Sequence, residues 1–356
     1  MTSALRPMSL ALAPLGMLYG AVTRARLRLY RSGLLKSVRV GAPVVSVGNL
    51  TAGGTGKTPL VEWAARALAR EGLRACVLTR GYGRADESRR VLASDGARVL
   101  AGVAECGDEP RLLAERLLGT AAVVCDRERV AAARWAREAL GAEVFVLDDG
   151  FQHLRLARDL DIVTLDATAP WGGGHMLPRG RLREPVSGLA RADCVVITRA
   201  ELAEDLEGLR AEVARVSCGR AAVFTSRVRT LGLEHLTEKG AGVNLESVRV
   251  GTVGAFCAVG NPGAFFEHVR RDGFELSYTR VFKDHHAYTQ TDAEAVAREA
   301  AGRGARALLT TAKDAVKLRG LDFTLPCYVV ATGLEFDDEA RLLGLLQAAV
   351  SAKRDS

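Results

Sequence analysis

The strongest evidence for the fold of this chain is one segment, Pro43-Val-Val-Ser-Val-Gly-Asn-Leu-Thr51-Ala-Gly-Gly-Thr-Gly-Lys57-Thr58. Residues 43–47 are typical of a buried strand, and a helix is expected over about 58–70, after the glycine-rich turn. A strand, a turn ending in Gly-Lys-Thr and a helix in this order form a P-loop, whose backbone N–H groups bind phosphate oxygens. The alternative, a plain glycine-rich helix cap, would need Lys57 and Thr58 to follow a strand by chance. The residues expected to bind phosphate are Thr51, Ala52, Gly53, Gly54, Thr55, Gly56, Lys57 and Thr58.

Short apolar runs alternate with helical stretches along the rest of the chain. Such alternation indicates βαβ units, so the fold class is α/β, with a P-loop NTPase-like parallel sheet. A second set of alternating elements begins near Gly251 and predicts a second, smaller α/β domain. The polar stretch 227–250 is interpreted as an irregular junction. The strands are expected at 43–47, 75–79, 121–125, 144–147, 161–165, 194–198, 252–259, 276–282 and 307–311, and the helices at about 58–70, 110–118, 130–140, 263–271, 292–303 and 338–349.

Composition is that of a soluble globular protein with reduced thiols. The 356 residues are 48% hydrophobic and 26% charged, which gives enough core for two domains. The seven cysteines include no CxxC pair. An odd, scattered set of this kind favours reduced cytosolic thiols over a disulfide framework or a zinc site.

The N-terminal segment combines an apolar run with a basic cluster. The apolar run Met8–Val22 is shorter than the ~20 apolar residues of a transmembrane helix, and no acidic residue precedes Glu62. A secretory signal and an ordinary core helix are alternatives. The favoured interpretation is a helix lying on the membrane surface, with its basic residues on anionic headgroups. Those basic residues are Arg6, Arg24, Arg26, Arg28, Arg31, Lys36 and Arg39.

Two adjacent carboxylates, Asp148 and Asp149, end the apolar run 144–147. Carboxylates at the carboxyl end of a buried strand beside a P-loop strand suit the aspartate that holds Mg²⁺ in P-loop enzymes. With the hydroxyl of Thr58, they are expected to bind Mg²⁺, while Lys57 reaches the β- and γ-phosphates of ATP. The alternative is a polar Asp-Asp-Gly turn.

Several motifs along the chain resemble those of a known family, the tetraacyldisaccharide 4′-kinases that phosphorylate the lipid A precursor in Gram-negative bacteria. Thr51 agrees with that family, whose loop begins with Thr or Ser, whereas Ala312 departs from its usual Glu. The matching motifs are Ser46-Val-Gly-Asn-Leu-Thr-Ala-Gly-Gly-Thr-Gly-Lys-Thr-Pro59, Arg80-Gly-Tyr-Gly83, Gly107-Asp-Glu-Pro110, Asp148-Asp-Gly-Phe-Gln-His153, Leu182-Arg-Glu-Pro185, Gly260-Asn-Pro262, Phe265-Phe266, Asp284-His285 and Thr311-Ala-Lys-Asp-Ala-Val-Lys317.

The resemblance implies that ATP phosphorylates the 4′-hydroxyl of a tetraacylated glucosamine disaccharide 1-phosphate, giving lipid IVA. It implies Asp108 as the catalytic base, with His285 as its partner. Read alone, Asp108 also fits a helix start, and a lone histidine is usually structural. The resemblance further places Glu184 near the metal, and Gln152, His153 and Arg127 near the phosphates.

The same resemblance implies a location, and the alternation of elements along the chain predicts a domain organisation. The enzyme would act on its lipid at the cytoplasmic face of the bacterial inner membrane, with ATP and Mg²⁺ as cofactors. The expected parts are a membrane-associated segment, 1–40, a P-loop kinase domain, 41–226, a smaller α/β domain, 227–335, and a C-terminal helix, 336–356.

Other functional classes fit the features of this sequence less well than a lipid kinase does. A membrane-bound P-loop ATPase switch would carry a signature lysine at the position of Ala52. A soluble kinase of a small metabolite would leave the acid-free N-terminal stretch unexplained. A nucleic-acid partner is not expected, because few aromatic residues accompany the arginine clusters.

Overall fold

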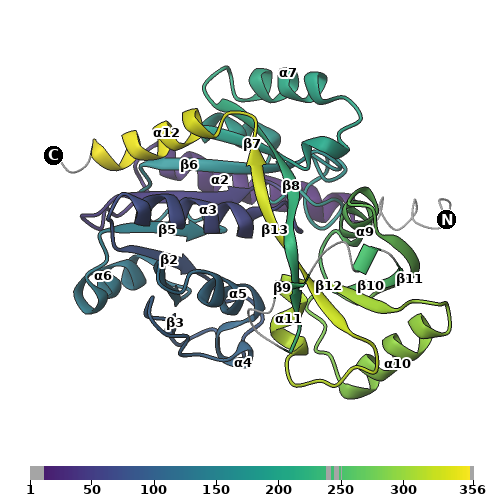
Figure 1. Cartoon of the computed structure of the whole chain (residues 1–356). Coiled ribbons are helices and arrows are strands. Elements are labelled where there is room, and N and C mark those ends of the chain that lie inside the picture. The colour runs from purple at the N-terminus through teal and green to yellow at the C-terminus, as the bar shows by residue number, and fades with distance from the viewer. Residues whose placement is uncertain (1–11, 238–241, 244–247, 250, 353–356) are drawn as a thin grey trace.

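One continuous sheet runs through both lobes of the molecule (Figure 1). The computed structural model describes residues 12–237, 242–243, 248–249 and 251–352. The sheet has 13 strands, in the order β11-β10-β12-β13-β8-β7-β6-β1-β5-β2-β4-β3, with β9 paired to β8. The strands are β1 (Val44–Asn49), β2 (Ala75–Thr79), β3 (Val91–Ser94), β4 (Ala121–Cys125), β5 (Val144–Asp148), β6 (Leu160–Asp166), β7 (Cys194–Thr198), β8 (Ala222–His235), β9 (Gly242–Val243), β10 (Thr252–Cys257), β11 (Glu275–Val281), β12 (Ala307–Thr311) and β13 (Cys327–Phe336).

The first lobe, here called the P-loop lobe, is built on a parallel sheet. Strand β1 pairs in parallel with β5 on one side and with β6 on the other, and only the edge strand β3 is antiparallel to its neighbour. Its central parallel strands, such as β1 and β5, are buried on both faces, as parallel strands covered by helices must be. This confirms the predicted α/β class. Its helices are α3 (Lys57–Arg70), α4 (Val103–Cys106), α5 (Asp108–Arg116), α6 (Arg129–Leu140) and α7 (Leu206–Val216), with short 3₁₀ turns η1 (Val186–Arg191) and η2 (Ala200–Leu202).

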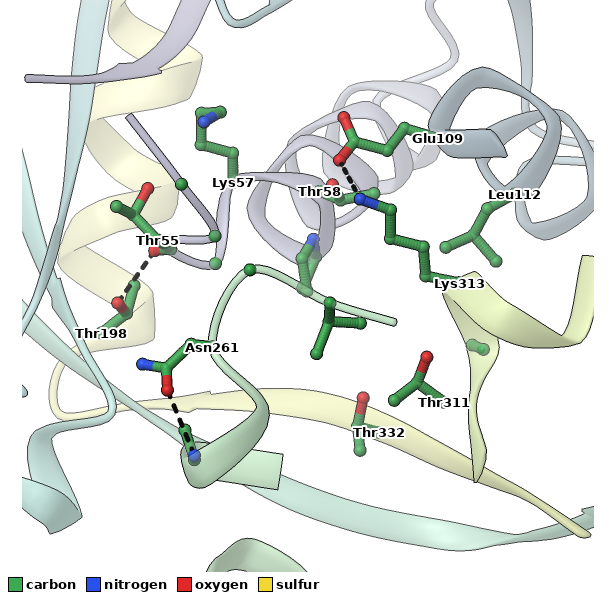
Figure 2. A pocket seen from close by; sticks show the side chains of 18 of the residues that line it. Thr55, Lys57, Thr58, Glu109, Leu112, Thr198, Asn261, Thr311, Lys313 and Thr332 are labelled. Carbon is green, nitrogen blue, oxygen red and sulfur yellow. Dashed lines mark hydrogen bonds and ion pairs between the residues drawn. The ribbon is translucent and has the colours of Figure 1, made fainter. Parts of the chain in front are cut away.

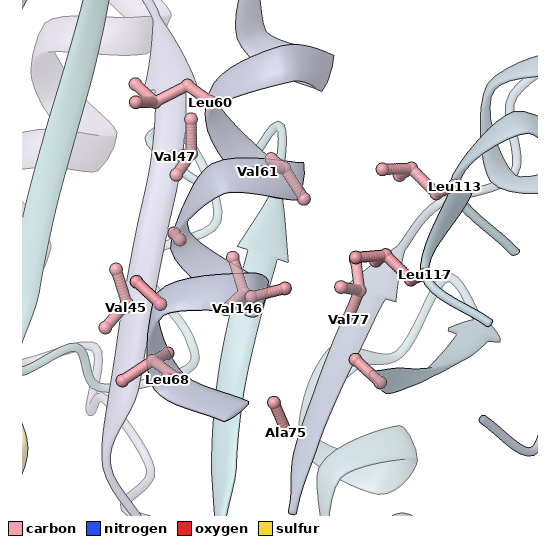
Figure 3. Packing of buried hydrophobic residues seen from close by; sticks show 14 of the residues in the cluster. Val45, Val47, Leu60, Val61, Leu68, Ala75, Val77, Leu113, Leu117 and Val146 are labelled. Carbon is pink, nitrogen blue, oxygen red and sulfur yellow. The ribbon is translucent and has the colours of Figure 1, made fainter. Parts of the chain in front are cut away.

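The main core of this lobe fixes the direction of α3. Leu60, Val61 and Leu68 of α3 are buried against the valines of the sheet, among them Val45 and Val47 of β1 (Figure 3). Burying side chains of this size stabilises each by about 1.5–3 kcal/mol relative to exposure. Because α3 is held on β1, its N-terminus is held directly after the glycine-rich turn.

Within the described part of the chain, two long antiparallel strands join the lobes. Strand β8 runs through the expected junction as far as His235 and pairs with β13 in antiparallel register. The second lobe continues with β10, β11 and β12, and the helices α9 (Pro262–Arg271), α10 (Gln290–Ala301) and α11 (Ala312–Leu318). The last helix, α12 (Glu339–Ser351), then returns to the P-loop lobe, where Leu342 and Leu346 are buried in its core. The lobes are therefore tied at two places along the chain.

The N-terminal helix α2 (Ala13–Arg31) presents apolar side chains to solvent. Pro14 lies in its first turn, where a proline costs no hydrogen bond. Gly16 and Gly20 face the segment around Met176, so this face of α2 is packed on the P-loop lobe. Within the described part of the chain, no helix is long and apolar enough to cross a membrane; residues 8–11 of the predicted apolar run lie outside it. The exposed apolar residues of α2 are Leu15, Met17, Leu18, Tyr19, Val22 and Leu29.

Candidate active site

A cavity of about 590 Å³ opens between the lobes, above the carboxyl ends of the P-loop strands. All eight residues predicted to bind phosphate line it: Thr51, Ala52, Gly53, Gly54, Thr55, Gly56, Lys57 and Thr58. Gly53 and Gly56 have φ of 114° and 80°, a region that favours glycine. Below the loop, Thr198 Oγ1 donates to the Thr55 carbonyl at 2.9 Å (Figure 2). The loop shape is therefore fixed by side chains beneath it and open to a ligand above.

The two predicted metal-binding aspartates differ in their partners. Oδ2 of Asp148 accepts a hydrogen bond of 3.0 Å from the Thr79 hydroxyl, whereas its Oδ1 is buried and has no hydrogen-bond partner among the described residues. Burial, followed by the charges of Glu109 and Asp149, raises the pKa of Asp148 to about 6. A buried carboxylate with one free oxygen is suited to a cation, since a cation would offset both the repulsion and the lost hydration.

Asp149 is instead held by two cations. Its two oxygens accept hydrogen bonds of 2.7 Å from the two terminal nitrogens of Arg183, and Lys57 Nζ lies 3.4 Å from its Oδ1. Burial opposes ionisation, but the Arg183 and Lys57 contacts dominate and hold the pKa of Asp149 well below its ordinary value. Arg183 also donates to Asn49 and lines the cavity. The sequence prediction did not single out Arg183, although it lies within the matching Leu-Arg-Glu-Pro motif.

Asp108 and His285 meet across the two lobes. Nδ1 of His285 lies 3.0 Å from each carboxylate oxygen of Asp108. Asp108 is 5% exposed and lies behind His285, which lines the cavity. Burial works against ionisation of Asp108, yet His285, Lys313 and Lys317 bring its pKa down to about 2. The hydrogen bond to Asp108 raises the pKa of His285, against the opposing effect of burial.

Two lysines of α11 complete this cluster. Lys313 Nζ contacts Glu109 at 2.9 Å (Figure 2). It also lies 3.4 Å from Asp284. Lys317 Nζ, on a side chain only 8% exposed, lies 3.7 Å from Asp108 and 3.4 Å from Asp314. Because α11 packs against α5, these ion pairs also bind the second lobe to the first. The sequence prediction assigned no role to either lysine.

A second contact between the lobes lies under the P-loop. The Arg199 guanidinium donates to the Gly54 carbonyl at 3.1 Å and pairs with Asp166 at 2.5 Å. Asn261, at the start of α9, donates to the same Asp166 carboxylate at 3.1 Å. A side chain at Gly260 would lie 2.8 Å from the Gly54 nitrogen, so the two loops touch backbone to backbone. A change in lobe arrangement therefore acts on the phosphate loop directly.

Four residues expected near ATP or its metal do not line the cavity: Arg127, Gln152, His153 and Glu184. Glu184 is 1% exposed, and its oxygens are engaged by Arg191 at 2.7 Å and by Gln152 at 2.7 Å. Gln152 also donates to the Asn49 carbonyl at 2.9 Å. Arg127 is exposed. Gln152, which is held by Glu184, thus supports the backbone of Asn49, and Arg127 faces solvent. The expected contacts of these four residues with ATP or its metal stay predictions.

Three non-glycine residues of this site have strained backbone conformations. Asp149, Arg199 and His285 adopt φ of 56°, 55° and 62°, although none of them is glycine. Such residues are uncommon and persist where the surrounding structure fixes them, often at functional sites. The arrangement combines a phosphate loop, a cation position and an acid–histidine pair, which together can carry out phosphoryl transfer to a hydroxyl group.

Comparison with known proteins agrees with this chemistry. A family model described as tetraacyldisaccharide-1-P 4′-kinase matches residues 8–351. The tetraacyldisaccharide 4′-kinase of Anaeromyxobacter dehalogenans strain 2CP-C is 49% identical over 315 residues, which cover 88% of this chain and 81% of that protein. The enzyme of the same name from Pelobacter propionicus is 44% identical over 314 residues, 87% of this chain and 83% of that protein. The crystal structure of LpxK from Aquifex aeolicus in complex with ATP superposes with a TM-score of 0.78 at 31% identity, covering 96% of this chain and 99% of that one.

Proposed function

The chain belongs to the tetraacyldisaccharide-1-P 4′-kinase family, and we propose that its P-loop holds Mg²⁺-ATP while the Asp108–His285 pair activates the acceptor. The reaction is transfer of a phosphoryl group from ATP to the 4′-hydroxyl of tetraacyldisaccharide 1-phosphate, giving lipid IVA in lipid A biosynthesis. Family membership does not favour the alternatives, a P-loop ATPase switch or a kinase of another small metabolite.

The phosphate loop and His285 line one cavity, and this placement supports the roles assigned to them. Lys57 and the loop amides lie where they can neutralise phosphate charge, and His285 lines the same cavity. Mg²⁺ fits the donor set formed by the free Oδ1 of Asp148 and the hydroxyl of Thr58. When bound, it would neutralise charge that develops on the phosphate oxygens. No group of three or more His, Cys, Asp or Glu in the described residues forms a cation site, which agrees with a metal held largely by phosphates and water.

The proton of the attacking hydroxyl goes to the Asp108–His285 pair. A sugar hydroxyl is a poor nucleophile, so a base within hydrogen-bond reach is useful during the attack. Asp108 is ionised at neutral pH because its pKa is about 2. Its charge stabilises the incoming proton on either member of the pair, and the pair acts as one unit.

Membrane association through α2 suits an amphiphilic acceptor. The N-terminal half of α2 exposes apolar side chains, among them Met17, Leu18 and Val22, which are 75%, 62% and 60% exposed. Its C-terminal half exposes arginines, among them Arg24 and Arg28. An exposed apolar face next to arginines is typical of a helix that lies in a lipid surface. Since ATP is cytosolic, we place the enzyme at the cytoplasmic face of the bacterial inner membrane.

The direct test is a reaction with purified components. Protein, ATP, Mg²⁺ and detergent-dispersed tetraacyldisaccharide 1-phosphate should give a product one phosphate heavier by mass spectrometry. A chelator should stop the reaction, and excess Mg²⁺ should restore it. Phosphorylation that continues in the chelator would refute the metal assignment, and no phosphorylated lipid under any condition would refute the assignment as a whole.

A further inference from the structure

Glu201, in the 3₁₀ turn that follows β7, carries a carboxylate oxygen without a partner. The residue lines the cavity. Its Oε1 accepts a long hydrogen bond of 3.4 Å from the Val228 backbone N–H, whereas Oε2 is buried and has no hydrogen-bond partner among the described residues. A buried acceptor left unpaired costs about 1–3 kcal/mol, and more when it is charged. A ligand that donates a hydrogen bond at this point would remove the cost.

The position of Glu201 relative to the phosphate loop indicates which ligand this is. Strand β7 lies two strands from β1, on the side of β6, whereas Asp148 ends β5 on the opposite side of β1. Thr198 and Asn261 lie on one side of the loop, and Glu109 with Lys313 on the other (Figure 2). In phosphoryl transfer the attacking and leaving oxygens are roughly in line. In the proposed function the acceptor would come from the side of His285, so the nucleoside would extend toward β7.

The cavity wall around Glu201 suits a flat, mostly apolar ring. Leu202, Val228 and Phe265 line this part together with His268. His268 is close enough to Glu201 for the carboxylate to influence its pKa, although burial is the larger effect and lowers that pKa. Apolar walls with one convergent polar group are the usual form of a site that binds a heterocycle.

We propose that Glu201 is the residue that recognises the base of the nucleotide, with Oε2 accepting a hydrogen bond from the 6-amino group of adenine. A 6-oxo purine presents an acceptor at that position and would be repelled by the carboxylate. Glu201 would thus determine specificity for ATP without touching the reacting phosphate. This inference rests on the proposed function, because it needs the nucleotide to lie in this cavity.

The test compares ATP with purine riboside 5′-triphosphate, which lacks only the 6-amino group. In the wild-type enzyme, kcat/KM should be roughly 10- to 100-fold lower with the purine analogue, the loss expected when a charged acceptor is left unpaired. In Glu201→Ala the two nucleotides should be used about equally. Glu201→Ala also loses the hydrogen bond from the Val228 backbone N–H. A second variant, Glu201→Gln, keeps one oxygen acceptor on the side chain. Its discrimination should be intermediate.

A matched control is Glu204→Ala, which removes an exposed carboxylate three residues further along the chain. It should discriminate as the wild type does. Equal use of both nucleotides by the wild type, or full discrimination by Glu201→Ala, would overturn the proposal. Either result would leave lipid phosphorylation by ATP intact, so the failure is distinguishable from failure of the proposed function.

Discussion

The His285 ring nitrogen Nδ1 lies 3.0 Å from both carboxylate oxygens of Asp108, although 177 residues separate the two in the sequence. Asp108 is the first residue of α5 in the P-loop lobe, and His285 follows β11 in the second lobe. The contact therefore exists only while the lobes keep their relative position. In the proposed mechanism, catalysis therefore depends on lobe packing through this pair.

The first prediction concerns this pair. Asp108→Ala and His285→Ala should each lower kcat by about 10²–10⁴-fold, the usual contribution of a base. The double variant should lose little more than the worse single variant, because catalytic groups that act as a unit are not additive. Affinity for ATP should be retained in all three, since neither residue belongs to the phosphate loop. The measurements are kcat for each variant and nucleotide binding by titration calorimetry.

The neighbouring His286 provides the control for this prediction. Its ring bonds to Asp292 at 3.1 Å and stacks on Phe282, away from Asp108. His286→Ala should therefore leave kcat within a few-fold of the wild type. Losses that multiply in the double variant would show that Asp108 and His285 have independent roles.

The second prediction concerns Lys317, which contacts Asp108 but does not line the cavity. Lys317→Met removes a buried positive charge that holds the pKa of Asp108 low. The Asp108–His285 pair should then bind a proton more tightly, so the acid limb of the kcat/KM profile should move to higher pH. At pH values on the acid limb, kcat/KM of Lys317→Met should be roughly tenfold or more below that of the wild type. Lys317→Arg keeps the charge and should restore the limb, and the exposed Lys283→Met should not move it. An unchanged profile in Lys317→Met would show that the charge of Lys317 does not control protonation of the Asp108–His285 pair.

The interior of the P-loop lobe could be predicted from the sequence because its strands are uninterrupted apolar runs. The expected bounds of β2, β4 and β7 agree with the structure, as do those of β12 in the second lobe. Strands β8 and β13 were not predicted. The second half of β8 is mixed in polarity and partly exposed, and the apolar start of β13 gives way to half-buried residues. Their long antiparallel pairing is a tertiary contact between distant segments, which local patterning does not report.

Residues of the site were predictable where a local motif fixes them. Every member of the phosphate loop lines the cavity, since strand, turn and helix are contiguous. The pairing of Asp108 with His285 came only from the family resemblance, because it depends on how the lobes pack. Gln152 and Glu184 also lie in matching motifs, and in the structure Gln152 bonds to Glu184 and to the Asn49 carbonyl. A motif shows that a residue is needed, but not whether it contacts the ligand.

The third prediction tests the phosphate loop. Lys57→Ala should lower kcat/KM by at least about 10²–10³-fold, because it removes a charge that stabilises the transferring phosphoryl group. The fold should be kept, since Arg183 still holds Asp149 by two hydrogen bonds. The measurements are the rate of lipid phosphorylation and the circular dichroism spectrum. Wild-type activity in this variant, or phosphorylation without ATP, would refute the P-loop assignment.

The fourth prediction tests membrane binding through α2. Replacing Met17, Leu18 and Val22 together with Gln should release the protein from vesicles of anionic phospholipid, because these side chains are exposed and apolar. The KM for micelle-presented lipid should rise, and the KM for ATP should not. Flotation assays and kinetics give the two readouts. The exposed Leu118 and Leu231 on other elements supply a control: the double change to Gln should leave flotation unaltered. Full vesicle binding by the triple variant would place the membrane contact elsewhere.

The fifth prediction separates a structural role for His153 from the nucleotide-binding role expected from sequence. His153 does not line the cavity, and its Nε2 is buried without a hydrogen-bond partner among the described residues. Burial, assisted by Arg129 and other arginines, lowers its pKa to about 4. His153→Gln should therefore leave the KM for ATP unchanged, while His175→Gln, which alters an exposed histidine, provides the control. A severalfold rise in this KM would restore His153 to the nucleotide site.

The pH dependence of stability gives the second readout for His153. Because the pKa of His153 is lower in the folded protein, the unfolded chain binds the proton more tightly. The free energy of unfolding therefore decreases as the pH falls. The wild type should thus lose stability relative to His153→Gln between the ordinary pKa of 6.5 and the folded value of about 4. The relative loss should approach about 3.5 kcal/mol well below pH 4, from about 1.4 kcal/mol per pKa unit, and should be absent at pH 8. Urea unfolding of both proteins at pH 8, 6 and 4.5 measures the difference. A constant difference across this range would show that the His153 ring is not held neutral by its burial.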